Sequence, residues 1–87
     1  MTVVETNLFK RDRKRMVNRG KPFVKLGAMV ALIAARQPLP PQHRDHPLTG
    51  NYGGYRECHS EPDWMLVYRL FGGTLELYRT GTHSDLF

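Results

Sequence analysis

The sequence predicts an α+β fold in which a short N-terminal strand and two helices pack on one face of a small antiparallel sheet. Two observations support this fold. Apolar residues recur at intervals of three and four in the first part of the chain, and at intervals of about two after residue 50. Prolines at positions 38, 40 and 41 separate the two patterns. We expect one domain, residues 1–87, around one modest core.

Local signals define the first strand and the first helix. Thr2–Glu5 is rich in β-branched residues, which favours an edge strand. Thr6 or Asn7 can cap a helix that continues to about Asn18. Gly20 is expected to end this helix, because glycine readily adopts the left-handed conformation that follows a helix C-terminus.

A second helix is predicted from Pro22 to about Arg36, since proline fits the first helical turn. Its apolar residues form one stripe that should face the core: Phe23, Leu26, Met29, Val30 and Ile33. The later part of the chain predicts strands or strand fragments at residues 50–55, 56–61, 64–70 and 74–80. The pair Gly72-Gly73 favours a hairpin turn between the last two.

The basic charge of the chain lies at its N-terminal end. Residues 1–25 contain eight cations and two anions, a net charge of +6, whereas the other 62 residues contain five cations and six anions, a net charge of −1. A basic segment of this kind predicts an anionic partner. The candidate contacts are the cations of the first helix: Lys10, Arg11, Arg13, Lys14 and Arg15.

The single cysteine, Cys58, excludes an intramolecular disulfide and fits a reducing compartment. The N-terminus lacks the pattern of a signal peptide, and the apolar run at residues 26–35 is too short to cross a bilayer. A cytoplasmic protein is therefore expected. Alternation along residues 55–61 places Cys58 on the face of the strand opposite His59, so Cys58 should be buried against the helices.

Histidines and an aspartate in short polar segments are the candidate catalytic groups: His46, His59, Asp63 and His83. Imidazoles exchange protons near neutral pH, and cleavage of RNA through its own 2′-hydroxyl needs both a base and an acid. Arginine binds phosphate through its planar fork, which makes Arg44, Arg56 and Arg79 candidates for the substrate phosphates. Trp64 and Phe87 are candidates for stacking on a base. The pattern favours acid–base cleavage of RNA.

A metal centre is the competing chemical interpretation. His43 and His46 are three residues apart, and Cys58, His59 and His83 could in principle join them. This spacing matches no closed zinc site, so neither a metal nor another cofactor is expected. His43, in its proline-rich loop, is expected to be a solvated bystander.

Three segments carry a family resemblance. RDHPLTGNYGGYRECHSEPDW at residues 44–64, LVYRL at 66–70 and RTGTHSDLF at 79–87 resemble the YafQ branch of the RelE superfamily of bacterial toxins. The similarity covers about residues 38–87, whereas the first 37 residues share only helix content and basic charge. The resemblance implies a microbial-ribonuclease type of fold, with helices packed against an antiparallel sheet.

The resemblance also implies a function. Toxins of this family are ribosome-dependent endoribonucleases that cut messenger RNA in the ribosomal A site, and a cognate antitoxin holds them inactive. The antitoxin complex represses its own operon, so operator DNA is reached only through the antitoxin. The family's active-site positions fall on His46, His59, Asp63 and His83, with Phe87 as the aromatic position. His83 is then the implied general acid, and the base remains open among the other three.

Three alternatives stay open at this point. The chain could be a non-catalytic module that binds RNA or the ribosome, with its histidines as polar contacts. It could serve mainly as a partner in the repressor complex on DNA. It could also be a general ribonuclease for free RNA, although the basic first helix fits docking on ribosomal RNA better.

Overall fold

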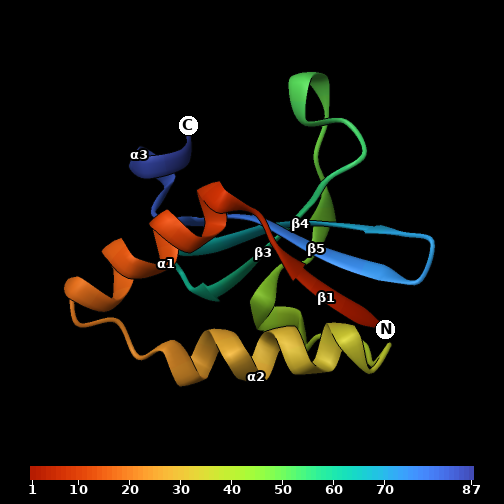
Figure 1. Cartoon of the computed structure of the whole chain (residues 1–87), viewed down its shortest axis with the longest axis horizontal. Coiled ribbons are helices and arrows are strands. Elements are labelled where there is room, and N and C mark those ends of the chain that lie inside the picture. Colours follow the sequence, from red (N-terminus) through yellow and green to blue (C-terminus); the bar gives the residue numbers. More distant parts are fainter.

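The computed structural model describes residues 1–87 as two helices packed against one face of a five-stranded sheet (Figure 1). The strand order is β1-β5-β4-β3-β2. β1 pairs with β5 in parallel, and the other neighbours are antiparallel. The elements in chain order are β1 (Thr2–Glu5), α1 (Asn7–Asn18), α2 (Phe23–Ala34), the 3-10 helix η1 (Pro41–His43), β2 (His46–Pro47), the 3-10 helix η2 (Gly50–Tyr52), β3 (Arg56–Glu61), β4 (Trp64–Phe71), β5 (Thr74–Gly81) and α3 (His83–Leu86).

The N-terminal half agrees with the sequence prediction. Thr6 caps α1, and its hydroxyl accepts a hydrogen bond of 3.0 Å from the Phe9 backbone N–H. Gly20 follows the helix with a φ of +81°, the left-handed conformation for which glycine was expected. In α2 the predicted apolar stripe is buried at Leu26, Met29 and Ile33. These predictions are confirmed. They could be made from the sequence because caps and helical periodicity depend mainly on residues close in sequence.

The strand predicted at residues 50–55 is wrong. Gly50 and Gly54 have φ values of +65° and +90°, which are incompatible with an extended strand, and η2 occupies the start of the segment. The edge strand next to β3 is instead β2, where His46 lies opposite Glu57 of β3. The hairpin at Gly72-Gly73 is confirmed, with positive φ at both residues as a two-residue type I′ turn requires.

The main core lies between the sheet and the two long helices. It is formed by apolar side chains of α1, α2 and the central strands: Phe9, Met16, Leu26, Met29, Ile33, Cys58, Trp64, Leu66, Tyr68, Leu75 and Leu77. A smaller cluster of Met65, Val67 and Leu86 covers the opposite face of the sheet. No helix is long and apolar enough to span a bilayer.

Candidate active site

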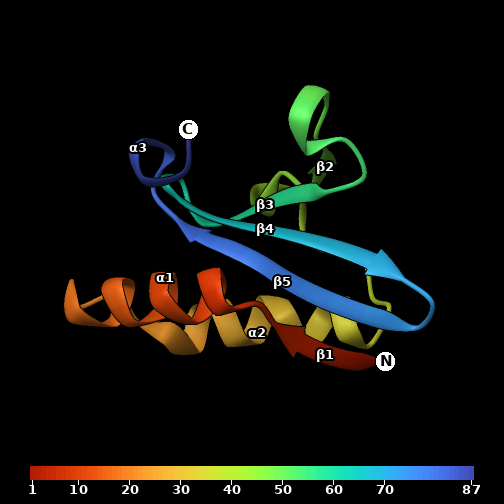
Figure 2. The ribbon, with the colours of Figure 1, turned by 45° about the horizontal axis from the view of Figure 1, so that its top comes forward.

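The candidate catalytic side chains lie on the sheet face opposite α1 and α2. Figure 2 shows these two helices on one side of the sheet, while α3 and the segment around β2 rise on the other. His59 and Glu57 of β3 lie opposite Met65 and Val67 of β4, which belong to the small cluster on that face. The alternation of the strand therefore directs His59 away from the main core, as predicted.

Two of the predicted histidines meet at one carboxylate. Glu57 Oε1 lies 3.2 Å from His59 Nε2 and 3.6 Å from His46 Nε2. The two imidazole rings are nearly parallel, with centroids 6.5 Å apart. Glu57 is 7% exposed, so its carboxylate forms the floor beneath the two rings.

Backbone carbonyls define which ring nitrogen carries the hydrogen. His46 Nδ1 lies 2.6 Å from the Arg44 carbonyl, and His59 Nδ1 lies 3.1 Å from the Pro62 carbonyl. A carbonyl oxygen can only accept, so each Nδ1 donates its hydrogen there. In the neutral ring Nε2 is then left with a lone pair that faces Glu57 Oε1, and only a ring that has taken up a proton at Nε2 can donate to this carboxylate. Either histidine can therefore act as a base through Nε2.

His83 approaches the site from α3. Its backbone N–H donates a hydrogen bond of 3.0 Å to Asp63 Oδ1, so the aspartate of the β3–β4 turn binds the first N–H of the short helix. The ring centroid of Phe87 lies 5.4 Å from that of His83 and 5.4 Å from that of Tyr52. Because Pro62 holds His59 while Asp63 holds α3, this turn links His59 to His83.

Arg44 stays a candidate phosphate ligand and lies beside His59. It is exposed and lines a cavity of about 250 Å³ together with Gln42, His59 and Pro62. Its backbone is in the left-handed region, with a φ of +49°, and its carbonyl holds His46. No carboxylate pairs with its guanidinium, which leaves the planar fork available to a phosphate.

Trp64 cannot stack on a substrate base, and its prediction as a substrate-binding residue is wrong. The indole is fully buried in the main core, and Nε1 donates a hydrogen bond of 2.9 Å to Thr80 Oγ1. Trp64 begins β4 with its side chain on the helix side of the sheet. Of the two predicted stacking residues, Phe87 keeps an open aromatic face, since its side chain is half exposed.

The other two predicted arginines are held within the protein. Arg56 forms contacts of 3.3 Å with both oxygens of Asp45, whereas Arg79 bonds Asp12 at 2.6 and 3.2 Å. These carboxylates raise the pKa of each guanidinium. Asp12 is 2% exposed and also accepts from the Thr80 backbone N–H, so this contact ties α1 to β5. Both guanidiniums therefore take part in ion pairs within the fold, and their role as phosphate ligands stays a prediction.

The basic helix contains both paired and unpaired cations. Arg13 bonds Glu5 at 3.0 Å, and Arg15 lies 3.7 Å from both Asp12 and Asp85. The exposed side chains without a carboxylate partner are Lys10, Arg11 and Lys14. The predicted anion-binding surface is thus smaller than the sequence suggested.

Two further predictions have opposite outcomes. Cys58 is fully buried beneath the helices, as expected, and its burial raises the pKa of the thiol. His43 is not a solvated bystander. It is half-buried, and its Nδ1 lies 2.6 Å from the His59 carbonyl, which ties η1 to β3.

Sequence reasoning assigned no role to two carboxylates near the candidate histidines. Glu57 was placed on the His59 face, but its contact with His46 depends on the pairing of β2 with β3. Asp85 was missed because no helix was predicted after residue 80. The spacing Thr82-x-x-Asp85 is a capping signal that could have revealed this helix. No group of three histidine, cysteine or carboxylate side chains is arranged to hold a metal ion.

Comparison with known proteins identifies the family. A model described as the bacterial toxin of type II toxin–antitoxin system, YafQ, matches residues 1–87. This chain belongs to the YafQ toxin family. The mRNA interferase toxin YafQ of Escherichia coli K12 is 45% identical to it over 80 residues, which cover 91% of this chain and 87% of that relative.

Solved structures of bacterial toxins share the fold. The crystal structure of the E. coli DinJ–YafQ toxin–antitoxin complex matches with a TM-score of 0.89 and 40% identity, covering 98% of this chain and 94% of that chain. The metal-bound toxin from Helicobacter pylori matches with a TM-score of 0.94 and 40% identity, covering 100% and 99%. The predicted α+β fold, with its N-terminal strand and its helices on one face of the sheet, is confirmed.

Proposed function

We propose that this YafQ-family protein is an endoribonuclease that cleaves messenger RNA on the ribosome by acid–base catalysis. The observation that carries the proposal is the grouping of His46 and His59 at Glu57, beside an α3 that presents His83. The E. coli relative is an mRNA interferase, which agrees with this chemistry.

In the proposed reaction the 2′-oxygen bonds to phosphorus while the bond from phosphorus to the 5′-oxygen breaks. His46 or His59 takes the 2′-hydroxyl proton at Nε2, and His83 gives a proton to the leaving 5′-oxygen. The hydrogen bond from His83 N–H to Asp63 favours an orienting role for the aspartate over that of a base. Arg44 would hold the phosphate, and Phe87 would stack on a neighbouring base.

The general-acid assignment is tested by His83→Gln. Because the ring of His83 is exposed, the protein should fold normally, and single-turnover cleavage should fall by about 10²-fold or more. Ribosome affinity should stay the same. A substrate with sulfur in place of the 5′-oxygen should restore the rate, since sulfur leaves without a proton. Full activity of His83→Gln on the ordinary substrate would contradict the proposed mechanism.

Metal-independent cleavage is part of the proposal, because the histidines can supply both proton-transfer roles. We expect cleavage to proceed at an unchanged rate in excess EDTA added as its magnesium complex, which removes copper and zinc but leaves the Mg²⁺ that ribosomes need. The solved H. pylori toxin is metal-bound, so copper and zinc should also be titrated into the assay. Loss of cleavage in EDTA and recovery with one of these ions would contradict metal independence.

The partners follow from the same proposal. An antitoxin would bind this toxin, as DinJ binds YafQ in the E. coli toxin–antitoxin complex. It would hold the toxin inactive, and operator DNA would be bound only through that antitoxin. The exposed cations Lys10, Arg11 and Lys14 would contact ribosomal RNA in the cytoplasm. A non-catalytic ribosome-binding module is the alternative. It would predict ribosome binding by the native protein without cleavage of the message.

A further inference from the structure

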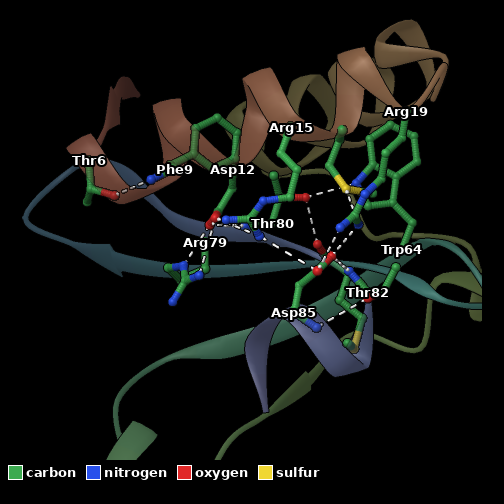
Figure 3. A network of polar contacts seen from close by, with 12 residues as sticks. Thr6, Phe9, Asp12, Arg15, Arg19, Trp64, Arg79, Thr80, Thr82 and Asp85 are labelled. Atoms are coloured by element: carbon green, nitrogen blue, oxygen red, sulfur yellow. Dashed lines mark hydrogen bonds and ion pairs between the residues drawn. The ribbon is translucent and has the colours of Figure 1, made fainter.

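The four-residue helix α3 depends on tertiary contacts, because an isolated helix of this length is not stable. Figure 3 shows the main contact, in which Arg19 at the end of α1 faces Asp85 of α3. Arg19 Nη1 donates to Asp85 Oδ2 at 2.6 Å, and Nη2 donates to Oδ1 at 3.0 Å. This is the two-pronged geometry in which arginine binds a carboxylate most specifically.

Asp85 also organises the start of α3. Its Oδ2 accepts from the Thr82 backbone N–H at 2.9 Å, and its own backbone N–H donates to Thr82 Oγ1 at 3.2 Å. The guanidinium of Arg19 holds the pKa of Asp85 well below its usual range. The carboxylate therefore joins α1 to the helical turn that begins next to His83.

Gly81 shows how closely this turn packs. A Cβ atom at position 81 would lie 2.9 Å from Asp85 Cβ and 3.0 Å from Asp85 Oδ2. Glycine is therefore required here for a close approach, since any side chain would push Asp85 away from Arg19.

We propose that Arg19 is a positioning residue for the reaction described above: by binding Asp85 it fixes α3 and thereby the ring of His83. The inference rests on the proposed function. The rest of α1 is attached independently, because Asp12 bonds Arg79 and Thr80 of β5. Loss of Arg19 should therefore leave the helix and the sheet in place while α3 becomes more mobile.

The test compares Arg19→Ala with Arg13→Ala. Arg13 is the matched control. It lies in α1, the helix that Arg19 ends, and it also forms an ion pair, but its partner Glu5 belongs to β1 and not to α3. Single-turnover cleavage of ribosome-bound message should fall by about tenfold or more in Arg19→Ala, because small displacements of catalytic groups are costly. It should stay unchanged in Arg13→Ala. Arg19→Lys keeps the charge but loses the two-pronged contact, so its rate should be intermediate.

A substrate with sulfur at the 5′ position separates positioning from general destabilisation. If Arg19 acts through the proton of His83, the sulfur substrate should abolish the defect of Arg19→Ala. Equal losses on both substrates, or an unchanged rate on the ordinary one, would overturn the proposal. Gly81→Ala should show the same loss of rate on the ordinary substrate and the same recovery on the sulfur substrate.

Amide hydrogen exchange makes the outcome independent of activity. In Arg19→Ala, amides 85–87 should exchange faster, while those of α1 and β5 keep their protection. Unchanged exchange in α3 would overturn the proposed anchor even if cleavage fell. If His83→Gln retains full activity, the proposed function fails, but the exchange experiment still decides whether Arg19 anchors α3.

Discussion

Trp64 is a structural residue, and this leads to a prediction at the scale of a single side chain. Trp64→Phe removes the hydrogen bond to Thr80 Oγ1 and leaves a small void in the main core. The free energy of unfolding should fall by about 1–3 kcal/mol. Urea denaturation measures this change. Ribosome binding should be unaffected when Trp64→Phe is placed in a toxin variant that cannot cleave the message. A normal stability with weakened substrate binding would restore the stacking role.

The sequence was sufficient to find the histidines but not the contacts of the arginines and the tryptophan. His59 was assigned to the open face by simple alternation along β3. Arg79 follows an irregularity in register, where Val67 pairs with Arg79 but Tyr68 pairs with Leu77. Such a bulge changes the direction of the side chains, and nothing local in the sequence marks it. The burial of Trp64 depends likewise on which face of β4 the helices cover.

At the scale of one element, the exposed cations of α1 should contribute to ribosome binding. Replacing Lys10, Arg11 and Lys14 by Gln should weaken ribosome binding and make it less sensitive to salt. With fewer phosphate contacts, binding releases fewer counterions from the RNA. The slope of log affinity against log salt should fall by roughly 0.7–0.9 for each contact removed. Arg13→Gln, which removes a cation already paired with Glu5, should change little. An unchanged slope in the triple variant would mean that this surface only confers solubility.

Elements with strong local signals were predicted well, and elements made by tertiary contacts were not. Both long helices and the Gly72-Gly73 hairpin follow from caps, periodicity and turn residues. By contrast, β2 is two residues long and exists because it pairs with β3. The helix α3 is stabilised by Arg19 and Asp63, which are 66 and 20 residues away from their partners Asp85 and His83.

At the scale of the whole molecule, three carboxylates tie the helices to the rest of the fold. Asp12 links α1 to β5, Asp85 links α3 to Arg19, and Glu61 at the end of β3 bonds Lys21 at 2.7 Å and Lys25 at 3.1 Å. The parallel pairing of β1 with β5 attaches the N-terminal strand, and with it the start of α1, to the sheet. None of these long-range pairings could be inferred from spacing alone, although the residues that form them are visible in the sequence.

These ties predict how the stability of the whole molecule depends on pH. The pKa of Asp85 is lowered by Arg19, and the pKa of Glu61 is lowered by Lys21 and Lys25. A carboxyl group with a lower pKa in the folded state stabilises the fold above its unfolded pKa of about 4 and loses this effect as the pH falls further. The melting temperature of the native protein should therefore decline below about pH 4.

The double variant Asp85→Asn/Glu61→Gln tests the origin of this decline. It should melt at a lower temperature than the native protein at pH 7, because both ion pairs are lost. The difference should shrink between about pH 4 and pH 2, since in this range the two carboxyls of the native sequence bind protons more readily in the unfolded chain than in the folded one, which favours unfolding. Thermal unfolding followed by circular dichroism measures both curves. A difference that stays constant down to pH 2 would mean that the two carboxylates stabilise the fold through packing rather than charge.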